Sequence, residues 1–232
     1  MSTGLRGMTT RATERLLADL SFELERRVGT ALEVVSDAHV EIARRVRAAE
    51  VADLVVLSAD TVAALDAEGF LVPGSIRPLF ESPVVVGVSA SIPKPPLASE
   101  EDLIRLLLAA RAIAISTGPS GAALMALIEM WGLGPELNQR IIQTSTGSPV
   151  AGLVASGQAD VGIQQRSELA GVPGVSVVGP LPGNAAVTTT FSGAALRTSP
   201  DPFAAMNALT FLALPAVADY IEQHGMHQAS AW

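Results

Sequence analysis

The stretch "ADLVVLSADTVAALDAEGFL", Ala52 to Leu71, decides the fold class of this chain. Its first part, Ala52 to Ala59, is a short apolar run typical of a buried β-strand. The residues that follow have the apolar spacing of a helix, and Gly69 stands where a glycine commonly ends one. A buried strand that leads directly into a helix is the repeating unit of a parallel α/β sheet.

The same alternation continues on both sides of this stretch. Before it, we predict a strand at Leu5 to Met8, a helix at Thr10 to Val28, a strand at Ala31 to Ser36 and a helix at Val40 to Glu50. After it, "AIAISTGPSGAALMALIEMWGLG" gives another strand and helix over Ile113 to Trp131. The pattern predicts an α/β fold throughout.

Composition excludes several classes of function. The chain has 232 residues, of which 49% are hydrophobic, so it can bury a large core. Its formal net charge of -8 argues against binding to nucleic acid or to an anionic membrane surface. It has no cysteine, which excludes thiol catalysis and thiolate metal sites.

The N-terminus lacks the apolar core of a secretion signal, and no apolar run approaches the length of a membrane span. As written, the chain is therefore expected to be cytoplasmic and not inserted in a membrane. If it is a mature form from which a signal was removed, it is expected to be periplasmic.

Four segments together resemble a known family: Ala52 to Leu71, "GLVASGQADVGIQQRSEL" at 152–169, "GVSVVGPLP" at 174–182, and the C-terminal "FLALPAV…GM". They are similar to the type 2 periplasmic solute-binding proteins, particularly the molybdate-binding-protein-like branch, which also includes aconitate isomerase. The resemblance implies a two-lobed fold with two crossover strands at a hinge and ligand held in the cleft between the lobes. Lobe 1 would comprise 1–82 and 191–232, and lobe 2 would comprise 83–190.

The junction "STGPSG" suits an anion. Helix N-termini carry unpaired N–H groups and a partial positive charge, and Ser, Thr and Gly add hydroxyl donors or close access to the backbone. Ser116, Thr117, Ser120 and Gly121 can therefore form a neutral cradle for a carboxylate or a tetrahedral oxyanion. An ordinary helix cap is the alternative interpretation.

Similar junctions recur along the chain, with Thr9 and Thr10 after the first strand, Ser58 and Ala59 after the third, and Ser148 before a later helix. In open α/β sheets the carboxyl ends of the strands line the ligand crevice. These positions also match those where the resembled family gathers its ligand contacts, so we predict that they bind the ligand.

Further candidates are Gln164, Gln165 and Arg166, at the end of the strand in "ADVGIQQR". A glutamine can both donate and accept, which suits an organic acid, and an arginine can hold a carboxylate in two hydrogen bonds. Arg166 is equally well explained as a solvated side chain or as a partner of Glu168. His39 is either a partly exposed loop residue or, if the protein is an enzyme, its catalytic base, with Asp37 as the competing base.

The sequence predicts a solute-binding protein whose partner is a small anion, a molybdate-like oxyanion or an organic acid. If the protein is exported, the permease of an ABC transporter is a further possible partner. One alternative is an aconitate-isomerase-like enzyme that shifts a double bond in an unsaturated di- or tricarboxylic acid; another is a ligand-sensing module. Nucleotide-binding motifs are missing, and neither a cofactor nor a metal is expected.

Overall fold

The computed structural model describes residues 4–144 and 149–229. The chain divides into two compact units. Unit 1 comprises residues 1–81 and 190–232, and unit 2 comprises residues 82–189. Both are built from helices packed on the faces of a β-sheet.

The sheet of unit 1 is parallel at its centre. Its strands are β1 (Leu5–Thr10), β2 (Leu32–Asp37), β3 (Leu54–Ser58) and β9 (Thr188–Ala195), with β10 (His227–Gln228) pairing to β4 (Arg77–Ser89). β1 lies between β2 and β3 and runs parallel to both, whereas β9 is antiparallel to β3. The carboxyl ends of β1, β2 and β3 therefore meet at one edge of this sheet.

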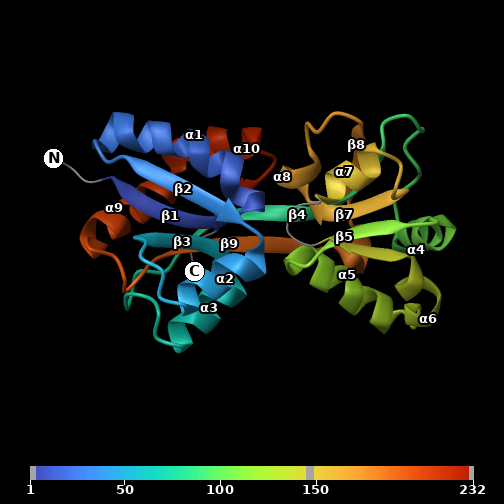
Figure 1. Cartoon of the computed structure of the whole chain (residues 1–232). Coiled ribbons are helices and arrows are strands. Elements are labelled where there is room, and N and C mark those ends of the chain that lie inside the picture. Colours follow the sequence, from blue (N-terminus) through green and yellow to red (C-terminus); the bar gives the residue numbers. More distant parts are fainter. Residues whose placement is uncertain (1–3, 145–148, 230–232) are drawn as a thin grey trace. The chain divides into compact units, whose positions relative to one another are not determined.

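Helices cover both faces of the sheet of unit 1 (Figure 1). One face is covered by α1 (Arg11–Val28), α9 (Pro202–Leu212) and α10 (Ala218–Gln223), the other by α2 (His39–Arg47) and α3 (Ala59–Ala67). Leu20 of α1 and Ile42 of α2 are fully buried on these opposite faces. Burying apolar side chains on both faces accounts for the continuous apolar runs seen in the sequence.

Unit 2 has the same layered construction. In its sheet β4 lies between β8 (Val175–Pro180) and β7 (Val161–Gln165), followed by β5 (Ile113–Ser116) and β6 (Ile141–Thr144). β5 runs parallel to both β6 and β7, so the carboxyl ends of these three strands share an edge.

The helices of unit 2 again occupy both faces. One face is covered by α4 (Glu100–Ala109), α5 (Pro119–Met130) and α6 (Gly134–Leu137), the other by α7 (Val150–Ala155) and α8 (Arg166–Leu169). Short 3-10 turns are found at Asn138–Arg140, Gly183–Ala185 and, in unit 1, Pro215–Val217.

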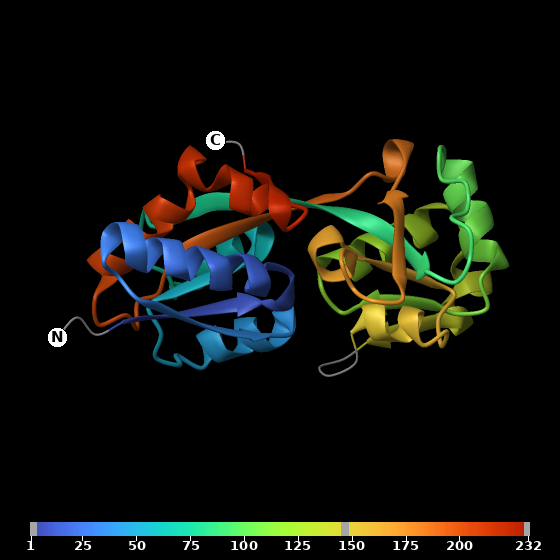
Figure 2. The same ribbon diagram turned by 90° about the horizontal axis from the view of Figure 1, so that it is seen from above.

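Two strands, β4 and β9, run through residues of both units, as Figure 2 shows. The predicted α/β fold is confirmed, with small differences at element ends. β1 extends two residues beyond the predicted Met8, because the β-branched Thr9 and Thr10 continue the pairing with β2. α2 begins at His39 and not at Val40, so His39 belongs to a helix and not to a loop.

Among the described residues, no single helix has both the length and the apolar composition of a membrane span. The segments Pro202–Leu212 and Pro215–Gln223 reach that threshold only when taken together across a bend of 66°. Leu209, Leu212 and Ile221 from these segments are fully buried in the core of unit 1.

Candidate functional site

Three helices of unit 1 begin at the edge where its parallel strands end. Thr10, Ala38 and Ser58 are the N-caps of α1, α2 and α3, and none of these side chains makes a capping hydrogen bond. The helices are 18, 9 and 9 residues long. Within the part of the chain that the structure describes, their first-turn N–H groups thus have no N-cap side chain as an acceptor, which favours an anion at this edge.

The two threonines of β1 differ in where their side chains bond. The Thr9 hydroxyl is fully buried, donates to the carbonyl of Val56 at 3.1 Å, and lies 2.6 Å from the Thr13 hydroxyl. These bonds tie β1 to β3 and α1 within unit 1. Thr10, the last residue of β1, is also buried, and its carbonyl accepts from Thr13.

A hydroxyl–imidazole cluster lies at the ends of β2 and β3. Ser58 Oγ donates to Thr61 Oγ1 at 3.1 Å, and Thr61 Oγ1 lies 2.8 Å from His39 Nε2. Ser58 Oγ is itself 3.4 Å from the same nitrogen. Ala59, which lies between Ser58 and Thr61 in the sequence, is half-buried and is the first residue of α3. We call Ser58, Thr61 and His39 the imidazole cluster.

His39 is half-buried, and its second nitrogen, Nδ1, is buried without a hydrogen-bond partner among the described residues. Burial lowers the pKa of His39, because a charged ring is poorly solvated there. The imidazole is therefore neutral at pH 7. The neighbouring Asp37 carboxylate accepts from the backbone N–H of Ala38 at 2.7 Å.

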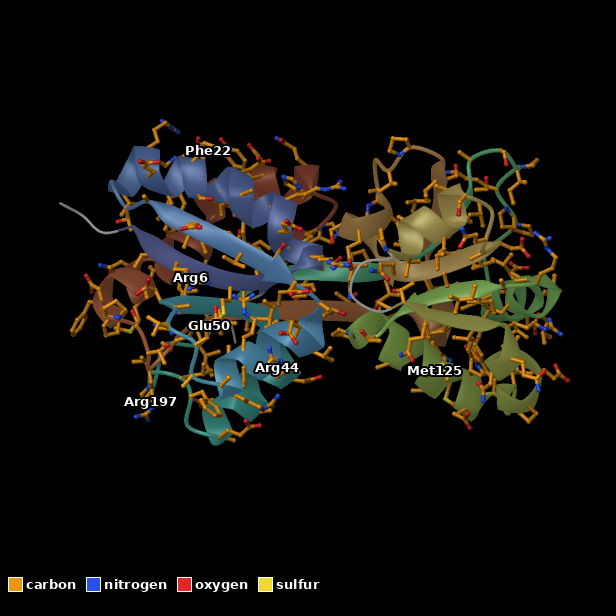
Figure 3. All side chains as sticks on the ribbon, viewed as in Figure 1. Arg6, Phe22, Arg44, Glu50, Met125 and Arg197 are labelled. Carbon is orange, nitrogen blue, oxygen red and sulfur yellow. The ribbon has the colours of Figure 1, made fainter. Side chains whose placement is uncertain are left out.

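The opposite edge of this sheet is charged. Glu50 accepts from Arg6 at 3.0 Å and from Arg45 at 2.6 Å, close to the amino ends of β1 and β3. Figure 3 labels Arg6 and Glu50. Both ends of these strands are polar, but the ion pairs are at the amino ends, whereas the imidazole cluster and the uncapped helices are at the carboxyl ends.

In unit 2, the predicted cradle forms the junction between β5 and α5. Ser116 Oγ accepts from the N–H of Gly118 and lies 3.2 Å from Ser120 Oγ. Ser120 is buried, whereas Thr117 is exposed. A Cβ at Gly121 would lie 1.9 Å from the carbonyl oxygen of Ser116, so only glycine allows this close approach of helix to strand.

The end of β7 supplies two buried glutamines. Gln165 donates from Nε2 to Thr189 Oγ1 at 2.6 Å, and the Oε1 atoms of Gln164 and Gln165 have no partner among the described residues. Arg166 is exposed at the start of α8. The predicted ligand residue Ser148 lies outside the described residues.

The comparison with protein-family models decides the family. Residues 5–227 match the model of the bacterial extracellular solute-binding proteins. The chain belongs to this family. The match covers both units, including β4 and β9.

One relative and two solved structures extend the comparison. Aconitate isomerase of a Pseudomonas species is 30% identical over 217 residues, covering 89% of this chain and 81% of that protein. The periplasmic molybdate-binding protein of Azotobacter vinelandii has a TM-score of 0.80 at 21% identity, covering 97% of this chain and all of that one. The sulfate-binding protein of Mycobacterium tuberculosis has a TM-score of 0.78 at 19% identity, covering 98% and 88%. The periplasmic-binding-protein fold is thereby confirmed.

Sequence reasoning missed Thr61, which links the other two members of the imidazole cluster. Thr61 could have been predicted from its position three residues after the N-cap Ser58, because a side chain at that position turns back toward the cap. It also missed Ser82 and Ser167, whose hydroxyls are buried without a partner among the described residues. Within the same residues, no group of three His, Asp or Glu side chains could hold a metal ion.

Proposed function

We propose that this solute-binding protein holds a small oxyanion or carboxylate and releases it unchanged. The observation that carries the proposal is the set of three uncapped helix N-termini at one edge of the unit 1 sheet. Backbone N–H groups and neutral hydroxyls bind an anion through hydrogen bonds and the helix dipole, without a cationic side chain. The net charge of -8 does not oppose this, because these dipoles act locally.

Unit 2 has donors and acceptors of its own that suit such an anion, at the junction of Ser116 to Gly121 and at the ends of Gln164 and Gln165. The unpartnered Oε1 atoms of the two glutamines are acceptors. They favour a ligand that carries a hydroxyl or a protonated oxygen, such as a hydroxy acid, over a fully deprotonated oxyanion. The molybdate-binding and sulfate-binding neighbours support an oxyanion as the wider class. A transporter permease would then be the partner that receives the ligand.

The second candidate function is isomerisation of an unsaturated di- or tricarboxylic acid. It is favoured by the 30% identity with aconitate isomerase and by a neutral imidazole at the same edge of unit 1. An allylic shift needs a base that removes a proton beside a carboxylate, and His39 is the candidate base.

The test is a thermal-shift screen of the purified chain with molybdate, tungstate, sulfate and a panel of di- and tricarboxylates. We expect one class of compound in this panel, either the oxyanions or the carboxylic acids, to raise Tm, as any ligand that binds only the folded state does. A response to none of them would overturn the proposal. Proton NMR of cis- and trans-aconitate incubated with the protein then separates the candidates, because interconversion would establish the isomerase.

Ser58→Ala and Ser21→Ala form a matched pair for locating the site. Both remove a hydroxyl from unit 1, but Ser21 bonds to the carbonyls of Leu17 and Ala18 within α1. We expect Ser58→Ala alone to reduce the ligand-induced rise in Tm.

A further inference from the structure

The hydrogen bonds of the imidazole cluster have a direction. The geometry between Ser58 and Thr61 makes Ser58 the donor and Thr61 Oγ1 the acceptor. A threonine hydroxyl has a single hydrogen, which remains available for donation. Among the described residues, the other partner of Thr61 Oγ1 is His39 Nε2, at 2.8 Å. The Thr61 hydrogen has an acceptor there only if Nε2 carries no proton, so the arrangement that satisfies both groups has Thr61 donating to Nε2.

The direction of this chain of hydrogen bonds sets the tautomer of His39. A neutral imidazole has one nitrogen that accepts and one that carries the proton. Since Nε2 accepts from Thr61, the proton is on Nδ1. That N–H is buried and has no acceptor among the described residues. The nearby Asp37 carboxylate, which accepts from the Ala38 N–H, makes no hydrogen bond to Nδ1.

We propose that His39 is an uncharged hydrogen-bond donor to the ligand through Nδ1–H, and that Thr61 is the positioning residue that holds this tautomer. The proposal rests on the anion-binding function given above. A buried N–H without a partner destabilises the chain, and a ligand oxygen would remove that cost. The ligand atom opposite His39 is then an acceptor, a carboxylate or oxyanion oxygen.

The same tautomer disfavours His39 as a catalytic base. The nitrogen left for a ligand already carries a proton and has no lone pair to accept another. The lone pair is on Nε2, where the Thr61 hydroxyl occupies it. The geometry of this cluster therefore supports binding over isomerisation.

Two isosteric variants of His39 test the donor role. An asparagine places its amide nitrogen near the position of Nδ1, whereas a glutamine places it near Nε2. Affinities for molybdate, sulfate and trans-aconitate are measured by calorimetry, and circular dichroism checks folding. For each probe that wild type binds, we expect the affinity of His39→Asn to stay within about threefold of the wild-type value. The affinity of His39→Gln should fall by about tenfold or more, the factor that 1.4 kcal/mol represents. The reverse order would overturn the proposal.

Thr61 is tested by its own pair of variants and by a spectroscopic readout. Thr61→Ser keeps the hydroxyl and should retain the wild-type tautomer, whereas Thr61→Val removes it and should move the ring proton toward Nε2. Long-range ¹H–¹⁵N correlation of the imidazole rings reports which nitrogen is protonated. The chain has three histidines, so the missing signal in His39→Asn assigns His39.

The two experiments separate the failure of this inference from the failure of the proposed function. A wild-type His39 protonated on Nε2 in the ligand-free protein would overturn the inference, even if an anion binds. If neither these three probes nor any other compound of the thermal-shift panel binds, the anion-binding function and the ligand contact of His39 both fail, while the NMR result still decides the tautomer.

Discussion

Gln165 donates a hydrogen bond of 2.6 Å from Nε2 to the hydroxyl of Thr189, joining the end of β7 to the start of β9 within unit 2. Both side chains are buried, at 2% and 7% exposure. In such surroundings an amide that loses its partner cannot turn to water instead. The bond therefore fixes the orientation of the Gln165 amide and leaves Oε1 as an acceptor without a partner among the described residues.

We predict that Thr189→Val lowers the free energy of unfolding by about 1–2 kcal/mol, because it leaves the Gln165 N–H group buried and unpaired. Urea unfolding measures the change. Thr189→Ser keeps the hydroxyl, so its free energy of unfolding is expected to fall clearly less than that of Thr189→Val. Equal losses for the two variants would show that the methyl group, and not the hydrogen bond, is what matters at this position.

Gly121→Ala is predicted to destabilise the chain by at least about 2 kcal/mol, since the new Cβ would lie 1.9 Å from the Ser116 carbonyl oxygen and the helix would have to move. Gly152→Ala in α7 is the matched control, because its nearest neighbour, a Pro149 carbon, is 3.6 Å away. That control should be neutral or slightly stabilising, as alanine is the better helix former. Thermal unfolding of both variants decides, and similar Tm values would contradict the prediction.

The alternation of strands and helices could be predicted because buried strands such as β3 are continuous apolar runs and helices such as α1 and α2 have an amphipathic period. The strand β3 is an example, because its run of apolar residues predicts burial and its residues Val55, Val56 and Leu57 are fully buried. The family and its solute-binding role could also be predicted, because the resemblance to this family lies in short segments of the amino-acid sequence.

The imidazole cluster could not be predicted, because it depends on side-chain directions. His39 and Ser58 are 19 residues apart and meet only because β1 separates β2 from β3 by one strand and α2 packs beside α3. In the same way, the bond from Thr9 to Val56 depends on the side-chain rotamer that Thr9 adopts across the sheet. Neither feature leaves a periodic pattern in the sequence.

Asp53→Asn is predicted to lower the free energy of unfolding by about 1.5–3 kcal/mol. The Asp53 side chain is buried, and its two oxygens accept from the backbone N–H of Arg6 at 2.8 Å and from the Ser199 hydroxyl at 2.5 Å. Asparagine has one acceptor oxygen, so one of these donors would face an NH₂ group. Urea unfolding at neutral pH measures the loss. The exposed Asp66→Asn in α3 is the control and should be close to wild type; an Asp53→Asn value equal to that control would refute the role assigned to Asp53.

The stability of the chain is predicted to depend on pH through His39. Its pKa is lowered in the folded chain by burial, so the unfolded chain binds the proton more readily. The contribution of the neutral ring is fully present above the unfolded value of about 6.5 and is lost as pH falls below it, by at most about 1.4 kcal/mol per pH unit. Urea unfolding at pH 7.5 and 5.5 should therefore show a larger loss for wild type than for His39→Asn. The other two histidines, His224 and His227, are present in both proteins, so any contribution from them cancels in the comparison. An equal loss in the two proteins would mean that folding does not lower the pKa of His39.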